Sequence, residues 1–219
     1  MNWLAHLYLS EPQLDMRLGN LLADVVRGAE RSRMSAQFRR GTACHAAIDA
    51  YTDAHAVVRR SCRRLDGPYR RFAGVLVDVF YDHFLARDWE RHACGTLEAF
   101  NEGLRAEILA RRPRLPAPGA MIVQRMILER RLLGYRDAKG IERALARMGS
   151  RIERRFGRTV ALAGAMALLE AHGDDLQRDF EEFFPQLQAH VGAWLEAESA
   201  PTELVQTPPV ALGRPAVQA

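Results

Sequence analysis

Residues 35–64, SAQFRRGTACHAAIDAYTDAHAVVRRSCRR, combine helical spacing with histidine and acidic side chains. His45, Asp49 and Asp53 follow one another four residues apart, so a helix places all three on one face. The positions between them are small or apolar, which is typical of a helix packed against neighbours. A histidine and two carboxylates on such a face need a compensating charge, a hydrogen-bond network or a metal ion. The stretch therefore predicts a packed helix that forms one wall of a site.

The rest of the chain has the composition of an all-α protein. Its 219 residues are 48% hydrophobic and 26% charged, which suits a globular domain with a substantial core. Apolar residues recur at helical spacing, whereas period-two alternation and β-branched runs are scarce. We expect a single-domain helical bundle over residues 1–198. Residues 199–219 contain four prolines and no helical face, so we expect a disordered tail there.

Capping and helix-breaking residues divide this domain into helices. Ser35 is the expected N-cap of the long helix, which should bend near residues 52–54 and resume towards Leu65. Pro185 is expected to kink or end the helix that begins at Asp174. The other predicted helices span residues 2–9, 14–26, 68–92, 96–112, 121–133, 137–156, 160–171 and 186–198.

The net charge and the arginine content indicate which kinds of partner the protein could bind. The net charge is +4, and Lys139 is the only lysine among 31 basic residues. Such arginine usage is typical of a GC-rich genome, and it also suits an acidic or phosphate-bearing partner. The sequence has no zinc-finger or RNA-binding motif and no glycine-rich phosphate loop, so we expect no nucleic-acid partner.

Cysteine spacing and hydropathy bear on the cellular compartment. Cys44, Cys62 and Cys94 match no metal or redox motif, and we interpret them as reduced thiols of a cytoplasmic protein. No stretch is long and apolar enough for a transmembrane helix, and the first residues lack the features of a signal peptide. No membrane partner is therefore expected.

Acidic and histidine residues form three groups on predicted helices within the first 85 residues. They are His6, Asn20, Asp24, His45, Asp49, Asp53, Asp78, Asp82 and His83. Facing helices that each contribute one or two ligands are typical of a metal site inside a helical bundle. Mixed histidine and carboxylate ligands suit Mn²⁺, Fe²⁺, Zn²⁺ or Mg²⁺. The same side chains also suit buried ion-pair networks, such as Asp24 with Arg27, and the spacing leaves both interpretations open.

Four fragments together resemble a known family. They are MNWLAHLYLS (residues 1–10), LGNLLADVVRG (18–28), HAAIDAYTD (45–53) and DVFYDHFL (78–85). Their order and distances are similar to those of the acyl carrier protein phosphodiesterase family. The resemblance implies an all-α fold similar to the HD-type metal-dependent phosphohydrolases, with a departure from their usual ligand order. It also implies hydrolysis of the phosphodiester between 4′-phosphopantetheine and a serine of holo acyl carrier protein, with a divalent metal, above all Mn²⁺.

Carried over to this sequence, the resemblance suggests roles for the acidic and histidine residues, but it leaves open which of them contact the ion. We expect the ligands among His6, Asp24, His45, Asp49, Asp82 and His83. Asp24 or Asp82 is expected to orient or deprotonate the attacking water. His83 or His6 would protonate the departing serine oxygen, and Arg27 would bind a phosphoryl oxygen. Supporting contacts are expected from Asn20, Asp53 and Asp78.

An acidic carrier protein would give the arginines a docking function that depends on salt. Candidates are Arg27, Arg31, Arg33, Arg39, Arg40, Arg59 and Arg63. One alternative function is a phosphohydrolase of the same type acting on a nucleotide or another small phosphodiester, whose activity would be insensitive to ionic strength. The other is a non-enzymatic, arginine-rich helical module that binds acidic partners or nucleic acid and holds no metal.

Overall fold

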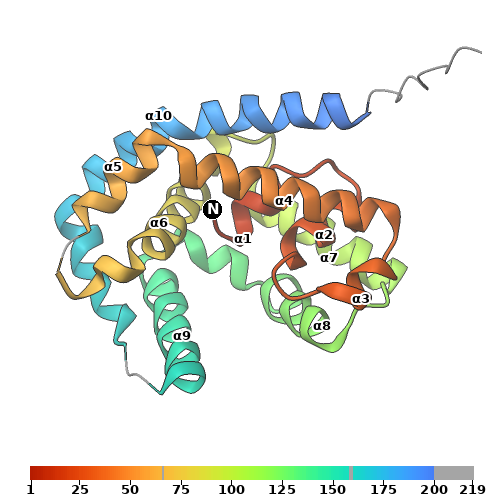
Figure 1. Cartoon of the computed structure of the whole chain (residues 1–219), viewed down its shortest axis with the longest axis horizontal. Helices are drawn as coiled ribbons and strands as arrows, with labels where there is room; N and C mark the ends of the chain where they lie inside the picture. The colour runs from red at the N-terminus through yellow and green to blue at the C-terminus, as the bar shows by residue number, and fades with distance from the viewer. Residues whose placement is uncertain (66, 158–159, 200–219) are drawn as a thin grey trace, which may run out of the picture.

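The stretch quoted above folds into two successive helices, α4 (Ala36–Ala54) and α5 (Ala56–Arg64), shown in Figure 1. The computed structural model describes residues 1–65, 67–157 and 160–199. Within these ranges every regular element is a helix and no strand occurs, which confirms the all-α class. The helices share one hydrophobic core and form a single domain. Residues 200–219 of the predicted tail lie outside the described residues.

Local hydrogen bonds explain where α4 and α5 begin. The Oγ of Ser35 accepts a hydrogen bond from the N–H of Phe38 at 3.1 Å, as an N-cap residue does. His55 separates the two helices, and its Nδ1 accepts a hydrogen bond from the N–H of Val57 at 3.3 Å. The bend predicted near residues 52–54 is therefore a junction between two separately capped helices.

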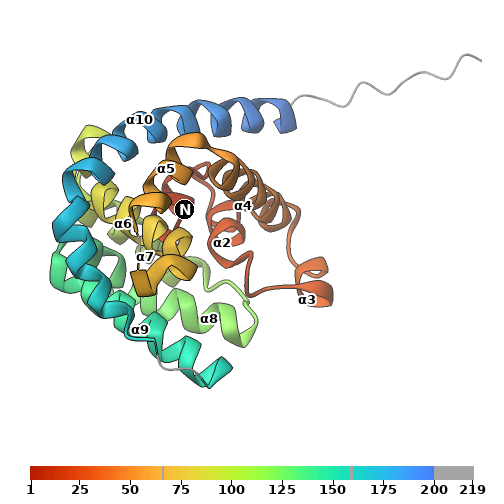
Figure 2. The ribbon, with the colours of Figure 1, turned by 60° about the vertical axis from the view of Figure 1, so that its left-hand side comes forward.

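The other helices pack around these two and around the short first helix, as Figures 1 and 2 show. They are α1 (Trp3–Tyr8), α2 (Leu14–Leu22), α3 (Gly28–Ser32), α6 (Ala73–Arg87), α7 (Leu97–Arg111), α8 (Ala117–Val123), α9 (Ala138–Phe156) and α10 (Met166–Ser199). The described single-turn elements are the 3₁₀ helices η1 (Gly67–Phe72), η2 (Trp89–Arg91), η4 (Arg131–Arg136) and η5 (Leu162–Ala165), and the π-helical turn η3 (Gln124–Leu128).

Several predicted helices differ from the structure. The helices predicted at residues 160–171, 174–184 and 186–198 are joined in α10, which follows η5, and the helix predicted at residues 14–26 ends at Leu22. The amphipathic stretch at residues 121–133 is divided among α8, η3 and η4, and Arg130 between η3 and η4 has a left-handed backbone with φ of 57°. Pro185 does not end a helix, because α10 continues through it as one element of 34 residues. Pro185 is exposed, and α10 changes direction along its length in Figure 2. Bending is the usual way for a helix to accommodate a proline.

A close helix crossing joins α2 to α4. Gly19 of α2 lies so near α4 that a Cβ on it would be 2.0 Å from the carbonyl oxygen of Phe38. Gly41 of α4 lies equally near α2, and its Cβ would be 2.1 Å from the carbonyl oxygen of Met16. Only glycine permits this approach of two backbones. The crossing brings Asn20, which follows Gly19, next to the polar face of α4.

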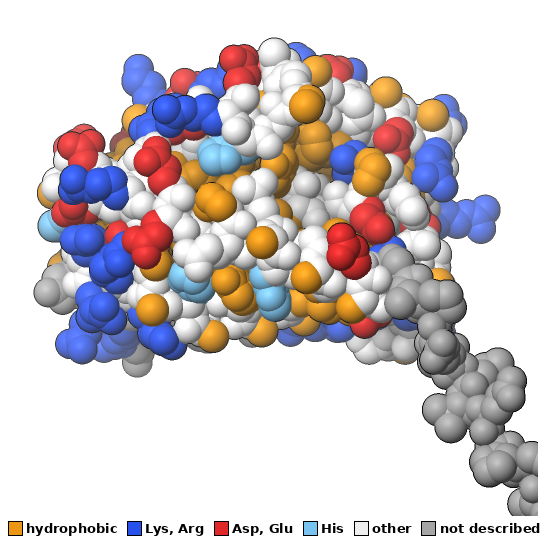
Figure 3. All heavy atoms as spheres, turned by 90° about the horizontal axis from the view of Figure 1, so that it is seen from above, with side chains coloured by type: hydrophobic (Ala, Val, Ile, Leu, Met, Phe, Trp, Pro, Cys, Tyr) orange, Lys and Arg blue, Asp and Glu red, His pale blue; other side chains and the backbone are white. Residues whose placement is uncertain are grey.

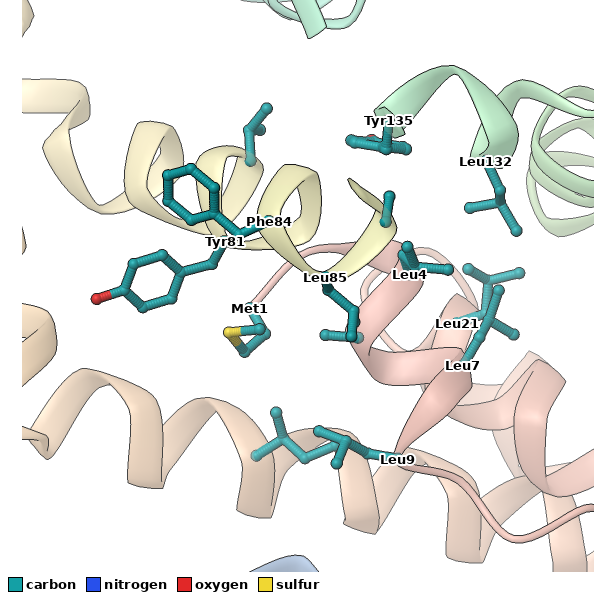
Figure 4. Packing of buried hydrophobic residues seen from close by; sticks show 14 of the residues in the cluster. Met1, Leu4, Leu7, Leu9, Leu21, Tyr81, Phe84, Leu85, Leu132 and Tyr135 are labelled. Atoms are coloured by element: carbon teal, nitrogen blue, oxygen red, sulfur yellow. The ribbon is translucent and has the colours of Figure 1, made fainter. Parts of the chain in front are cut away.

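The first helix is buried in the centre of the domain. Leu4 and Leu7 of α1 are fully buried, and Figure 4 shows them close to Leu85 of α6 and Leu132 of η4. The carboxylate of Asp82 fixes the beginning of α1, because its oxygens accept hydrogen bonds from the N–H groups of residues 4 and 5 at 2.7 and 3.1 Å. A carboxylate at a helix N-terminus also interacts favourably with the helix dipole. Asp82 thereby holds the first turn of α1 against α6.

Candidate metal centre

His6, His45 and Asp49 converge where α1 meets α4. One ligand atom from each side chain lies within 4.8 Å of the other two. The Nε2 of His6 is 3.2 Å from one oxygen of Asp49, and the Nε2 of His45 is 3.0 Å from the other. The two imidazole rings are stacked, with their centroids 4.1 Å apart. Atoms bound to one transition-metal ion at about 2.1 Å lie up to about 4 Å from one another, so the three residues fit a shared ion with small adjustments.

A backbone hydrogen bond orients the imidazole of His45. Its Nδ1 is 2.8 Å from the carbonyl oxygen of Asn20, so Nδ1 carries the proton and donates it. In the neutral ring Nε2 then has a lone pair and no hydrogen. This buried Nε2 has no hydrogen-bond partner among the described residues, because its close approach to Asp49 lacks hydrogen-bond geometry. An unpartnered imidazole lone pair beside a carboxylate is a ready ligand for a cation.

The side chain of Asn20 orients His6 in the same way. The hydroxyl of Ser10 donates to the carbonyl of His6, so the amide nitrogen of Asn20 must donate to the Ser10 oxygen, at 2.8 Å. The amide oxygen of Asn20 therefore faces the Nδ1 of His6, 2.7 Å away, and accepts its proton. The Nε2 of His6 is then also a lone pair, directed towards Asp49. Hydrogen bonds of this kind orient histidine ligands around metal ions in proteins.

The first residue adds polar groups to the same place. The carbonyl oxygen of Met1 lies 3.2 Å from the Nε2 of His6. The amino group of Met1 is buried and forms ion pairs with Asp78 at 3.0 Å and with Asp49 at 3.7 Å. Burial lowers the pKa of this amino group, but the two carboxylates more than offset it, so that its pKa is raised and it stays charged. Sequence reasoning missed these groups, because backbone atoms leave no side-chain signal.

The pKa shifts of the three converging residues indicate that the site favours a positive charge next to Asp49. Burial lowers the pKa of His6, which keeps its ring neutral. Burial opposes charge on His45 as well, but the facing Asp49 outweighs it and raises the pKa of His45. Burial would raise the pKa of Asp49, yet the two imidazoles hold it far below its usual range. A divalent ion between these groups meets the same demand without protonating either ring.

Asp24 and Arg27 lie at the solvent side of this cluster. An oxygen of Asp24 is 3.8 Å from the Nε2 of His45, and the Asp24 side chain is 77% exposed. Arg27 forms an ion pair with Asp24 at 3.4 Å and is also largely exposed. The cluster is therefore buried on the α1 side and accessible on the Asp24 side. Catalytic metal sites have such an open position, whereas structural sites are closed.

Three of the predicted site residues lie outside the converging group. Both oxygens of Asp82 are hydrogen-bonded to the first turn of α1, and Asp82 is not part of the converging group. The Nδ1 of His83 lies 2.7 Å from the carbonyl oxygen of Tyr135, and His83 lines a different cavity of about 180 Å³ with Arg87. Asp53 is exposed near the end of α4 and forms no ion pair with a described residue. The shared spacing of four residues therefore does not bring all these side chains together.

Most of the predicted docking arginines have partners inside the protein. Arg31 and Arg39 donate to nearby backbone carbonyls, and Arg40 forms a half-buried ion pair with Glu11. Arg59 and Arg63 are exposed on α5, and neither forms an ion pair with a described residue. These two lie four residues apart, so they project from the same side of the helix.

Within the described part of the chain, no helix has the length and apolar character needed to cross a membrane. No solved structure matches the chain. Comparison with sequences does identify relatives. Residues 1–187 match the family model described as acyl carrier protein phosphodiesterase. The chain is 33% identical over 191 residues to the acyl carrier protein phosphodiesterase of Yersinia enterocolitica, covering 86% of this chain and 96% of that protein.

Other relatives give the same result. The protein of that name from Serratia proteamaculans is 34% identical over 188 residues, covering 85% of this chain and 95% of the relative. The one from Escherichia coli is 33% identical with the same coverage. The range matched by the family model includes the fragments that carry His6, His45 and Asp49. The chain therefore belongs to the acyl carrier protein phosphodiesterase family.

Proposed function

We propose that this protein hydrolyses the phosphodiester that joins 4′-phosphopantetheine to a serine of holo acyl carrier protein. Water attacks phosphorus, the bond from phosphorus to the serine oxygen breaks, and the products are apo carrier protein and 4′-phosphopantetheine. Membership of the family supports the reaction class and the substrate. The compartment that we propose is the cytoplasm, in keeping with the free thiols of all three cysteines.

The observation that carries the proposal is the convergence of two imidazole nitrogens and one carboxylate at an open site. We assign a divalent ion, Mn²⁺ above all, to His6, His45 and Asp49, with Asp24 beside them. When bound, such an ion lowers the pKa of water and neutralises charge on phosphoryl oxygens. Mn²⁺ suits a set that combines imidazole and carboxylate ligands. Mg²⁺, Fe²⁺ and Zn²⁺ are the alternative ions, and the metal content of the purified protein distinguishes them from Mn²⁺.

The residues at the rim have separate roles in this proposal. Asp24 is exposed and close to His45, so its carboxylate is placed to accept the proton of the attacking water. Arg27 lies next to Asp24 and can donate hydrogen bonds to a non-bridging phosphoryl oxygen. Asp82 and His83 have positioning roles. Asp82 accepts hydrogen bonds from the N–H groups of residues 4 and 5 and so fixes the first turn of α1, and His83 is hydrogen-bonded to the carbonyl of residue 135.

Of the predicted docking arginines, we assign Arg59 and Arg63 to the binding of the acidic carrier protein. Their guanidinium groups are exposed and have no ion pair with a described residue, so they can bind acidic side chains of a carrier protein without losing an internal contact. Arg31, Arg39 and Arg40 already donate to groups of this protein, and we assign them to its structure. Attraction between opposite charges raises association rates at low ionic strength.

The test is incubation with holo carrier protein and Mn²⁺, followed by intact-mass measurement. We expect loss of the phosphopantetheine mass with the natural protein and about 100-fold slower loss with His45→Ala or Asp49→Asn, in line with the size of metal-ligand effects. His172→Ala is the matched control, because His172 lies on α10 outside the converging group. Metal content of each purified variant identifies the ion. If several holo carrier proteins keep their mass while the protein cleaves a nucleotide phosphodiester, the substrate assignment is wrong.

A further inference from the structure

A second cavity, which we call the α10 pocket, lies against the C-terminal half of α10. Its volume is about 460 Å³, and its lining includes Tyr8, Arg17, Trp89, Phe100, Gln188 and Val191. Figure 3 looks on to the α10 side of the molecule and shows hydrophobic side chains gathered in a hollow there. None of these residues belongs to the candidate metal centre. The volume is within the range of about 300–1,000 Å³ found for small-molecule sites.

Trp89 presents an unpaired hydrogen-bond donor in this pocket. Its side chain is only 2% exposed, and its indole Nε1 has no acceptor among the described residues. The ring is held firmly, edge-on to Tyr8 with centroids 5.4 Å apart and tilted against Phe100 at 4.9 Å. A buried donor without an acceptor costs about 1–3 kcal/mol. Because Nε1 is itself buried, an acceptor in the pocket relieves this penalty only when a small movement of the lining brings the two together.

Arg17 supplies a second donor and a positive charge next to the same ring. Its guanidinium carbon lies 5.2 Å from the centroid of Phe100, which is the ring that Trp89 also contacts. The Nε of Arg17 is buried without an acceptor, and the side chain forms no ion pair with a described residue. Glu107 acts on Arg17 electrostatically, but no ion pair joins them. A partly buried, unpaired guanidinium group favours an anionic ligand.

Tyr8 and Gln188 in the lining have hydrogen-bond partners, whereas the imidazole of His92 lies edge-on to Phe180 and Phe184. The hydroxyl of Tyr8 donates to the backbone carbonyl of His92 and accepts a hydrogen bond from Gln188 at 2.9 Å. The remaining walls include apolar side chains such as Val191. The pocket therefore combines two unpaired donors and one positive charge with an apolar surface.

We propose that the α10 pocket binds a small amphipathic anion, with a carboxylate or phosphate head group on Arg17 and Trp89 and an apolar chain against Phe100 and Val191. This site is separate from the metal centre and does not depend on the proposed phosphodiesterase reaction. Charge-assisted hydrogen bonds to the head group supply the selectivity for anions. The apolar chain supplies further binding free energy through the surface that it buries.

Binding of decanoate, decyl phosphate and decanol to the full-length protein tests this inference by isothermal titration calorimetry. We expect decanoate or decyl phosphate to bind at least about ten-fold more tightly than decanol, since a hydrogen bond to a charged group contributes about 1.5–3 kcal/mol. The stronger of the two anions identifies the head group. Arg17→Gln should abolish the preference for the anion, and Trp89→Phe should weaken it while keeping an aromatic ring. Arg114→Gln, at an exposed arginine outside this pocket, is the control and should bind as the natural protein does.

Cys94 provides an independent readout, because its exposed thiol lines the same pocket. The anion should slow alkylation of Cys94, followed by peptide mass mapping, and leave the alkylation rate of Cys62 unchanged. Equal binding of decanol and the two anions would overturn the proposal, and so would the absence of binding at millimolar concentration, which would leave water as the partner of Trp89. Binding that is lost in His45→Ala but kept in Arg17→Gln would place the ligand at the metal centre and also refute the proposal.

Discussion

Replacing Gly19 by alanine tests whether the crossing of α2 and α4 builds the metal centre. In an unconstrained helix position this change stabilises a protein by about 1 kcal/mol, because alanine has the higher helix propensity. At Gly19, however, the new Cβ would lie 2.0 Å from the carbonyl oxygen of Phe38, whereas real Cβ contacts are essentially never shorter than 3.0 Å. The two backbones must therefore separate by about 1 Å. Overpacking of this kind costs about 1–3 kcal/mol.

The same movement disturbs the site. The carbonyl of Asn20 accepts the hydrogen bond of His45 at 2.8 Å, and a separation of about 1 Å would take that distance to nearly 4 Å and break the bond. We therefore expect Gly19→Ala to lower both the free energy of unfolding in urea and the affinity for Mn²⁺. Gly103→Ala on α7 is the matched control, because nothing lies within 4 Å of a Cβ there, and it should be neutral or stabilising. If Gly19→Ala behaves like Gly103→Ala in both measurements, the close crossing does not determine the site.

Three further predictions concern the ligands, a buried carboxylate and the docking arginines. Asn20→Ala removes the acceptor that orients His6, so Mn²⁺ affinity measured by calorimetry should fall about 10–100-fold, and an unchanged affinity would contradict the orienting role. Burial raises the pKa of Asp82 to about 7, against the two N–H donors of α1, which lower it. The folded protein then retains a proton that the unfolded chain releases as the pH rises from about 4 to 7, so this contribution to stability is present at low pH and lost across that range. Asp82→Asn should therefore flatten the pH dependence of urea unfolding between pH 4 and 7, and an unchanged slope would show that Asp82 ionises normally. Arg59→Glu with Arg63→Glu should raise KM for holo carrier protein at low salt, less so at high salt, with kcat unchanged. The same charge reversal at exposed Arg125 is the control, and equal effects at both places would indicate only a general influence of net charge.

Much of the fold follows from local sequence patterns. Helical spacing, with few strand signals, predicts the all-α class, and the N-cap at Ser35 and the junction near residue 54 are visible in the residue types themselves. These features depend on interactions within one or two turns, so the sequence contains the necessary information. At Pro185 local rules predict either a kink or the end of a helix, and only packing within the domain decides that α10 bends and continues.

The site is determined only partly by such local patterns. The spacing of four residues places His45 and Asp49 on one face of α4, and the sequence alone identifies both as candidate ligands. The same spacing relates Asp78 to Asp82, yet Asp82 holds the first turn of α1 and Asp78 holds the amino group of Met1. Periodicity specifies which side chains share a face, but not which neighbour that face meets. The burial of α1 and the glycine crossing of α2 with α4 decide that His6 and Asn20 meet His45, because those contacts join residues far apart in the chain.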